Sequence, residues 1–263
     1  MGFTRHSGAF GLADEPAVPG LSHTLRTVAE YICRKEECPV EKTTDQTNGG
    51  SEKAAPGPEE YLEALYAEDE ALGLVKEAIR ANNMPDISVA PGYGRLLTML
   101  VGLTGAKRVL EIGALGGYSA ICLARGLGDG GQVLSLEVNA AFAETARQNV
   151  IKAGFGDKIG YRVADAVESL AALKEEGAKF DFFFIDADKV NYPVYLDYAI
   201  ELANPGAIII GDNILMRGRT IDAAVTKKSV EAMREFNRRF ASDPRLESTM
   251  LPAYDGLAVA RVK

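Results

Sequence analysis

Apolar and polar positions along the chain follow two different periods, and the alternation of these periods predicts its helices and strands. From residue 58 onward, short apolar runs alternate with longer segments in which apolar side chains recur every three or four positions. The short runs predict buried β-strands, and the longer pattern predicts amphipathic α-helices. The predicted strands are 108–111, 132–137, 158–163, 180–186, 207–211, 246–251 and 257–262. The predicted helices are 59–81, a segment from residue 118, 140–153, a segment ending at residue 173, 192–203 and 226–240.

The order of these elements predicts the sheet. Near-continuous apolar strands that alternate with helices are typical of a parallel sheet covered on both faces, and the right-handed crossover rule makes such a sheet doubly wound. The last two strands follow each other without a helix, and their turn contains Asp255-Gly256. Such a hairpin breaks the parallel order. We therefore predict an α/β fold with a doubly wound, mostly parallel, seven-stranded sheet and an antiparallel closing strand.

The first part of the chain differs in composition from the rest. Gly, Pro, Ser, Thr and charged residues dominate 1–20 and 41–57, which leaves too little apolar surface to offset the cost of ordering them. Between these stretches, apolar residues recur at helical spacing over 21–32. We expect 1–57 to be a mobile N-terminal extension with one short helix, followed by a single domain over 58–263.

Charge and residue counts exclude several classes of function. The net charge of -8 argues against nucleic acid as a partner, because such binding needs clustered Lys and Arg. No apolar run reaches the length of a membrane span, and no secretory signal is present, so we expect a cytoplasmic protein with no membrane partner. Both histidines, His6 and His23, lie in the extension. A Ser-His-Asp triad in the main domain is therefore excluded.

The residues after the first two strands favour an adenosine-containing cofactor. Ligands of open α/β sheets bind beyond the carboxyl ends of the strands. The Gly-rich segment 113–117 lacks the G-x-G-x-x-G spacing of dinucleotide binders and is preceded by an acid, Glu111. A carboxylate there would repel a pyrophosphate but attract an ammonium or sulfonium group, which favours S-adenosyl-L-methionine over NAD. Glu137, at the end of the second strand, suits the ribose hydroxyls. Asp165 either lies near the adenine or caps the next helix, and both can hold.

The fourth and fifth strands end in oxygen ligands. Asp186 follows the fourth strand, and Asp212 and Asn213 follow the fifth. Three hard oxygen donors without His or Cys suit Mg2+, although each could instead cap a loop or helix. A metal there could chelate two adjacent oxygens and lower the pKa of a bound phenol. Lys189, three residues after Asp186, is either the base that takes the phenolic proton or a solvated lysine at a helix start.

As an ordered set, these segments resemble the cation-dependent class I O-methyltransferases, the group of caffeoyl-CoA and catechol O-methyltransferases. The resemblance covers 58–263 and rests on 111–119, 136–139, 185–192, 211–213 and 255–261. It implies a Rossmann-like class I methyltransferase fold, with Lys189 as the base. It implies Mg2+, or Mn2+ or Ca2+, held by Asp186, Asp212 and Asn213. The residues implied around S-adenosyl-L-methionine are Val89, Glu111, Gly113, Ser119, Glu137, Ala166 and Asp188.

The resemblance also implies the substrate class and the assembly. The expected reaction moves a methyl group to one hydroxyl of a catechol-like small molecule or its CoA ester, and relatives are often homodimers. Two positions depart from the plant caffeoyl-CoA pattern, since Val89 replaces Thr and Arg95 replaces Gln. The segment 214–225, where substrate selection is expected, matches neither subgroup. Two alternatives are a nicotinamide oxidoreductase, for which no Tyr-x-x-x-Lys pair is evident, and a non-catalytic S-adenosylmethionine-binding protein, against which the joint presence of Asp186, Lys189, Asp212 and Asn213 argues.

Overall fold

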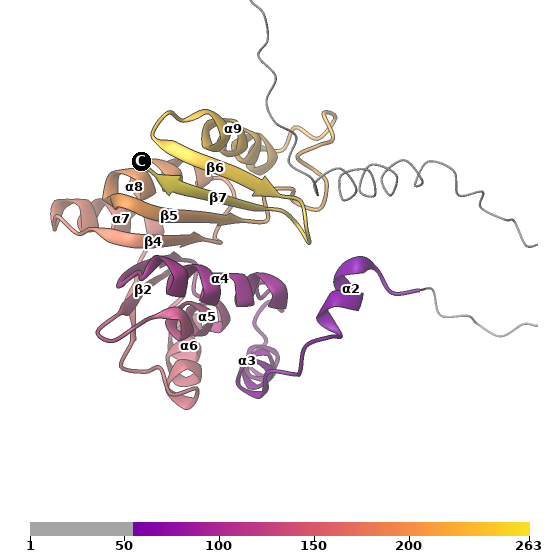
Figure 1. Ribbon diagram of the computed structural model, residues 1–263, viewed down its shortest axis with the longest axis vertical. Helices are drawn as coiled ribbons and strands as arrows, with labels where there is room; N and C mark the ends of the chain where they lie inside the picture. The colour runs from indigo at the N-terminus through magenta and orange to yellow at the C-terminus, as the bar shows by residue number, and fades with distance from the viewer. Residues whose placement is uncertain (1–54) are drawn as a thin grey trace, which may run out of the picture. The chain divides into compact units, whose positions relative to one another are not determined.

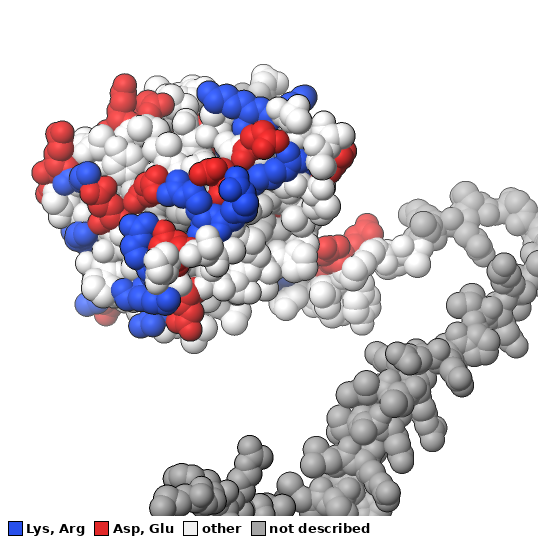
Figure 2. Space-filling view, turned by 90° about the horizontal axis from the view of Figure 1, so that it is seen from above, with Lys and Arg blue, Asp and Glu red and all other residues white. Residues whose placement is uncertain are grey.

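The computed structural model describes residues 55–263. The short helix predicted within 1–57 lies outside this part of the chain. Within it, no helix is long and apolar enough to cross a membrane. On the face seen in Figure 2, Lys and Arg side chains are interspersed with Asp and Glu.

Seven strands form one sheet in the order β3-β2-β1-β4-β5-β7-β6. Strands β1 to β5 pair in parallel, and β7 runs antiparallel to both β5 and β6. The predicted fold class is therefore confirmed. The winding reverses between β1 and β4, where an open α/β sheet forms its ligand crevice. The strands are β1 (Arg108–Ile112), β2 (Gln132–Glu137), β3 (Ile159–Val163), β4 (Phe180–Ile185), β5 (Ala203–Asp212), β6 (Leu246–Leu251) and β7 (Leu257–Val262).

Helices cover both faces of the sheet (Figure 1). One core packs beneath α3, α4, α5 and α6, and the other beneath α7, α8 and α9. Strand β4 contributes to both because its side chains alternate: Phe182 and Phe184 enter one core, and Phe183 and Ile185 enter the other. The helices are α2 (Pro58–Glu63), α3 (Glu70–Ala81), α4 (Pro91–Thr104), α5 (Tyr118–Gly126), α6 (Ala140–Lys152), α7 (Ala166–Glu175), α8 (Tyr192–Leu202) and α9 (Lys228–Ser242).

The prediction of one helix over 59–81 is wrong, because this segment forms two helices, α2 and α3. Asp69 has extended backbone angles, and its side chain accepts a hydrogen bond from Leu72 N at 3.1 Å. This cap begins a new helix, so one helix cannot run through Asp69. Helix α2 buries none of its residues, whereas α3 buries Leu72, Val75 and Ile79. The apolar residues of α2 and α3 therefore do not lie on one continuous helix face.

Two further elements differ from the prediction. Helix α4 was not predicted, although Pro91 begins it and Gly105 ends it in the left-handed conformation. Its buried residues Tyr93, Leu97 and Val101 are four positions apart and pack against the sheet. Strand β5 begins at Ala203, four residues earlier than predicted, and so includes Pro205 and Gly206. The pairing with β4 is irregular there, which lets the strand pass that pair.

Candidate active site

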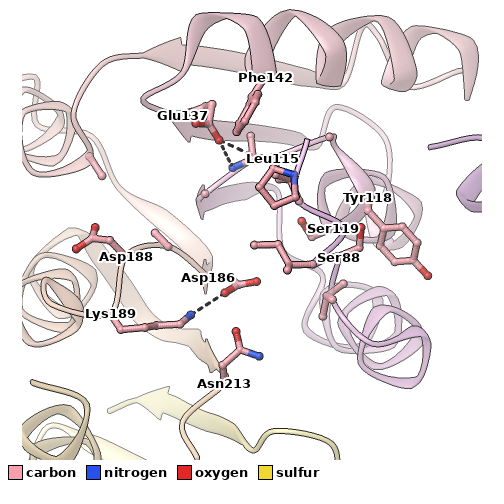
Figure 3. Close-up of a pocket in the computed structure, with 18 of the residues that line it drawn as sticks. Ser88, Leu115, Tyr118, Ser119, Glu137, Phe142, Asp186, Asp188, Lys189 and Asn213 are labelled. Carbon is pink, nitrogen blue, oxygen red and sulfur yellow. Dashed lines mark hydrogen bonds and ion pairs between the residues drawn. The ribbon is translucent and has the colours of Figure 1, made fainter. Parts of the chain in front are cut away.

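A cleft of about 930 Å3 lies at the carboxyl ends of β1, β2, β4 and β5. Figure 3 shows the side chains that converge on it from these strand ends and from the segment before α4. Two of the predicted residues, Glu111 and Asp212, do not line the cleft and are buried. The predicted residues that line it are Val89, Gly113, Ser119, Glu137, Ala166, Asp186, Asp188, Lys189 and Asn213.

Gly113 lets the turn after β1 lie directly against the end of β4. Its φ is 101°, and a Cβ placed there would lie 2.1 Å from the backbone oxygen of Asp186. No larger residue could occupy this position without moving one of the two strands. The glycine therefore fixes the distance between the predicted cofactor turn and the first predicted metal ligand.

Glu137 holds the Gly-rich turn from the end of β2. Its carboxylate accepts hydrogen bonds from the backbone N–H groups of Ala114 at 3.2 Å, Leu115 at 3.0 Å and Asn139 at 2.9 Å. The side chain also lines the cleft (Figure 3). These oxygens remain able to accept further hydrogen bonds, since a carboxylate has about four acceptor positions. Glu137 thus shapes the turn in addition to its predicted role toward a ribose.

Glu111 lies fully buried beneath the cleft. One carboxylate oxygen accepts a hydrogen bond from the Ser135 hydroxyl, and the other has no partner among the described residues. Burial, together with the charges of Asp186 and Glu137, raises the pKa of the Glu111 carboxyl to about 7. An unpaired buried acid is unfavourable by itself and becomes favourable next to a cation. Its surroundings fit the predicted ammonium or sulfonium partner.

The three predicted oxygen donors lie at the ends of two neighbouring strands. Ile185 of β4 pairs with Gly211 of β5, so Asp186 and Asp212 follow at neighbouring positions. Asp212 is only 3% exposed, and burial, reinforced by the charge of Asp186, raises the pKa of its carboxyl to about 7. One of its oxygens accepts a hydrogen bond from Asn213 N at 2.6 Å. Asn213 has a φ of 58° and lines the cleft.

Lys189 provides the cation nearest to this pair. Its Nζ donates to an Asp186 carboxylate oxygen at 2.8 Å (Figure 3) and also to the Tyr192 hydroxyl at 2.6 Å. Its side chain is 19% exposed, so it is not the freely solvated lysine of the alternative interpretation. Tyr192 is fully buried, and its hydroxyl lies 3.1 Å from Ile185 O and 2.9 Å from Asp212 O. This tyrosine ties the lysine to the ends of both strands, and the sequence analysis missed it.

The donor set is compatible with a hard divalent cation. In residues 55–263, no group of three or more His, Cys, Asp or Glu side chains is arranged to hold a metal ion. The predicted donor set is of a different kind, because it combines two carboxylates with one amide. The proximity of a buried carboxylate to a second carboxylate is unfavourable, and a cation would remove that cost.

The other predicted cofactor residues have local partners. Asp188 accepts hydrogen bonds from the Tyr195 hydroxyl and from Asn191, at 3.2 Å from its N and 3.0 Å from its Nδ2. Asp165 caps α7 by accepting from Val167 N at 2.8 Å and from Glu168 N at 3.2 Å. The capping interpretation of Asp165 is thus confirmed, and the same residue also lines the cleft.

Further lining residues were not identified from the sequence. Leu115, Tyr118 and Phe142 supply apolar and aromatic surface to the cleft, and the turn after β5 supplies Met216 and Arg217. Such side chains carry no distinguishing motif, because an apolar residue at helical spacing is usually part of a core. Only their position in the three-dimensional structure identifies them as residues that line the cleft.

Comparison with known proteins supports the resemblance. A family model described as O-methyltransferase matches residues 63–263. A catechol O-methyltransferase from Niastella koreensis is 38% identical over 77% of this chain and 95% of its own length. A caffeoyl-CoA O-methyltransferase from Eucalyptus globulus is 39% identical over 64% of this chain and 72% of its own. The crystal structure of a Bacillus cereus O-methyltransferase in complex with SAH has a TM-score of 0.74 and 40% identity, covering 78% of this chain and 96% of that one. This chain therefore belongs to the O-methyltransferase family, in the group that contains catechol and caffeoyl-CoA O-methyltransferases.

Proposed function

We propose that this chain uses a divalent cation, with Mg2+ as the first choice, to methylate one hydroxyl of a catechol-like small molecule or its CoA ester. The methyl donor is S-adenosyl-L-methionine, as the SAH in the Bacillus cereus relative suggests. The observation that carries the proposal is the convergence of Asp186, Asp212 and Asn213 on one side of Lys189. Hard oxygen donors beside a potential base are the chemistry that deprotonation and orientation of a diol require.

The cofactor half of the site would hold S-adenosyl-L-methionine, which supplies an electrophilic methyl group. Glu137 would accept hydrogen bonds from the ribose hydroxyls, and Glu111 would face the positive methionine end. The proposed contacts on the cleft walls are Val89, Gly113, Ser119, Ala166 and Asp188. Apolar Leu115 and Phe142 would exclude water from the same wall.

The chemical half of the site would handle the phenolic proton. Asp186, Asp212 and Asn213 would hold the cation, which would supply Lewis-acid chemistry that lowers the pKa of a bound phenol. Lys189 would accept the proton on its Nζ in its neutral amine form, while the Tyr192 hydroxyl keeps that amine in position. The phenol oxygen then forms the new O–CH3 bond as the S–CH3 bond breaks, which leaves S-adenosylhomocysteine.

The metal requirement is tested on the full-length protein. After treatment with EDTA, and with elemental analysis showing a metal-free sample, methyl transfer to catechol should stop and should return with Mg2+ or Mn2+. A second readout is direct Mn2+ binding, followed by electron paramagnetic resonance. Asp186→Asn and Asp212→Asn should weaken that binding, and Asp197→Asn, an exposed carboxylate on α8, serves as the matched control. Full activity of the metal-free enzyme would contradict the proposal.

The same assay addresses the alternatives. Family membership favours methyl transfer over the nicotinamide oxidoreductase. A non-catalytic S-adenosylmethionine-binding protein would bind SAH but methylate no catechol, with or without metal. We also propose that the chain acts as a homodimer on a small phenolic substrate, as the resemblance implies.

A further inference from the structure

Two arginines line the cleft from the turn that follows β5. Arg217 and Arg219 are exposed and share the cleft with Asp186 and Lys189. Neither guanidinium forms an ion pair within residues 55–263. The Nε of Arg219 donates to Met216 O at 2.8 Å, which leaves its two terminal nitrogens available. The guanidinium groups of Arg217 and Arg219 therefore line the cleft without a carboxylate partner.

The other arginines of the described part behave differently. All but one of them form an ion pair with an Asp or Glu, and the exception, Arg108, lies over the ring of Phe180 at 5.2 Å. The carboxylate of Asp255 also lines the cleft and accepts a hydrogen bond from the backbone N–H of Arg217. Two guanidinium groups therefore line the cleft together with the carboxylate of Asp255, in a chain whose net charge is -8.

The turn that carries these arginines is held rigidly. Met216, Arg217 and Gly218 have φ angles of 51°, 56° and 79°, a conformation that is unfavourable for the two non-glycine residues. The backbone persists in it because neighbouring segments bind it: Ile214 N donates to Gly256 O at 3.2 Å and Leu215 N to Asp255 O at 2.9 Å. A strained turn fixed in this way presents its side chains in a defined position.

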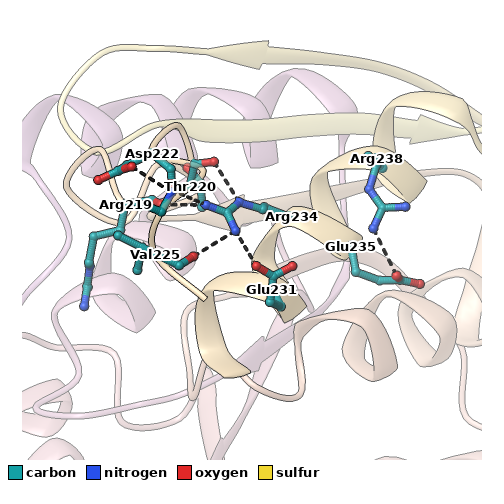
Figure 4. A network of polar contacts seen from close by, with 9 residues as sticks. Arg219, Thr220, Asp222, Val225, Glu231, Arg234, Glu235 and Arg238 are labelled. Carbon is teal, nitrogen blue, oxygen red and sulfur yellow. Dashed lines mark hydrogen bonds and ion pairs between the residues drawn. The ribbon is translucent and has the colours of Figure 1, made fainter. Parts of the chain in front are cut away.

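Arg234 of α9 holds the other side of the same turn (Figure 4). Its guanidinium donates to Thr220 O at 3.0 Å, Val225 O at 2.9 Å and Arg219 O at 3.2 Å, and also to Asp222 O. The carbonyl of Arg219 thus points toward Arg234, while its side chain is left to line the cleft. The backbone that carries these two arginines is therefore held from both sides.

We infer that Arg217 and Arg219 select catechol substrates that carry an anionic group, either a carboxylate or the phosphates of a CoA ester. This inference rests on the proposed function and adds the substrate class to it. A planar guanidinium binds a carboxylate or phosphate through two parallel hydrogen bonds, and it keeps its charge at any working pH. An anionic substrate would otherwise be repelled by the acidic residues of the cleft, so the arginines also offset that repulsion.

The test compares matched substrates on the full-length protein. Caffeate carries a carboxylate, its methyl ester carries none, and caffeoyl-CoA carries phosphates. We expect the native protein to prefer caffeate or caffeoyl-CoA over the ester by roughly tenfold in kcat/KM, because charge-assisted hydrogen bonds are strong but exposure weakens them. Arg217→Gln combined with Arg219→Gln should remove most of this preference. Arg238→Gln, which changes an exposed arginine of α9, should leave it as it is.

The possible outcomes distinguish a carboxylate from a phosphate as the anionic group, and they distinguish failure of this inference from failure of the proposed function. An arginine-dependent preference for caffeate identifies a carboxylate, and one confined to caffeoyl-CoA identifies phosphates. Equal kcat/KM values for acid, ester and CoA ester in the native protein would overturn the inference, as would an equal loss for all three in the double variant. If no catechol is methylated at all, the proposed function fails. Calorimetric dissociation constants for the same three compounds, with SAH present, then still report whether the arginines prefer an anion.

Discussion

Lys189 is held by contacts that would control its reactivity. Its Nζ lies 2.8 Å from Asp186 and 2.6 Å from the Tyr192 hydroxyl, and within residues 55–263 no histidine is present to replace it as a base. Lys189→Ala should lower kcat by roughly 10²–10⁴-fold, the usual contribution of a positioned proton acceptor. The loss should shrink at high pH, where the phenol ionises unaided. Steady-state kinetics with catechol at several pH values measure both effects.

A separate measurement distinguishes lost chemistry from lost binding at this position. The affinity for SAH, measured by calorimetry, should hardly change in Lys189→Ala. Lys174→Ala, in which an exposed lysine of α7 is removed, is the matched control and should keep its full rate. If kcat of Lys189→Ala falls less than about threefold with chemistry rate-limiting, the metal alone must account for deprotonation.

Glu111 gives the stability of the protein a pH dependence that can be isolated. Its carboxyl has a pKa raised from 4.5 to about 7, mainly by burial. The folded protein therefore keeps a proton that the unfolded chain releases, and stability falls as pH rises from about 4.5 to about 7 and then levels off. Through this group, raising the pH from 5.5 to 8 should lower the free energy of unfolding by about 2 kcal/mol. Glu111→Gln cannot titrate, so its profile should be flatter than that of the native protein.

Urea unfolding of the two proteins without cofactor checks this expectation. Asp212 also has a raised pKa, but it is present in both proteins and cancels in the difference. Parallel stability profiles across the pH range would show that Glu111 ionises freely in the folded state. The variant should also bind SAH more weakly, because a neutral amide no longer attracts the positive end of the cofactor.

The residues of the site differ in how far the sequence could reveal them. Asp186, Asp212 and Asn213 were predictable as a group because the ends of adjacent parallel strands meet at one edge. Tyr192 was not, since its role depends on reaching the carbonyl groups of two strands at once. The burial of Glu111 beneath the cleft was also not foreseeable, because one residue of shift along a strand reverses the direction of a side chain.

At the scale of elements, periodicity predicted the strands better than the first helices. The central strand β4 contains the continuous apolar run Phe182-Phe183-Phe184, which is typical of a sheet buried on both faces. The helix prediction for 59–81 was wrong because the capping residue Asp69 is part of a polar segment that also fits a helix surface. Helix α4 contains glycines at Gly92, Gly94 and Gly102, and these lower its apparent helical propensity. Packing against the sheet overrides that preference.

Arg234 should act on the substrate through the turn that it holds. Its guanidinium binds four backbone carbonyls of 219–225 and pairs with Glu231. Arg234→Gln should release this segment, raise KM for the phenol and change the affinity for SAH little, since the cofactor residues lie on other strands. A loss of about 1–3 kcal/mol in local stability is expected from removing hydrogen bonds to a charged group. Hydrogen exchange of 219–225 measures that release.

Arg234→Lys and Arg238→Gln complete this experiment. Lysine keeps the charge but lacks the planar fork, so it should restore the turn only in part. Arg238 lies on the same helix and pairs only with Glu235 at 3.3 Å (Figure 4), so its variant should exchange like the native protein. If KM for the phenol is unchanged in Arg234→Gln while 219–225 exchanges faster, the turn does not contribute to substrate binding.

At the scale of the whole molecule, the site depends on the order in which the strands are wound. The switch between β1 and β4 opens the crevice, and the antiparallel strand β7 places Gly256 against the turn after β5. A Cβ at Gly256 would lie 2.6 Å from a side-chain atom of Ile214, and its φ is 81°. The closing hairpin therefore also shapes the part of the cleft that is lined by the turn after β5. The sequence predicted the hairpin, but its contact with that turn required the three-dimensional structure.

Removal of residues 1–50 tests whether the described domain suffices for activity. Both hydrophobic cores of the described part consist of side chains between Leu72 and Val262, and the family match begins at residue 63. The Niastella koreensis enzyme matches 77% of this chain over 95% of its own length.

We therefore expect the shortened protein to melt within about 4 °C of the full chain, which corresponds to about 1 kcal/mol for a domain of this size. Its kcat/KM for catechol should change by less than about twofold, since ΔΔG‡ stays near zero when no site residue is removed. Light scattering on both proteins gives the oligomeric state. If the shortened protein becomes monomeric and loses most of its rate, the N-terminal extension contributes to a dimer on which the site depends.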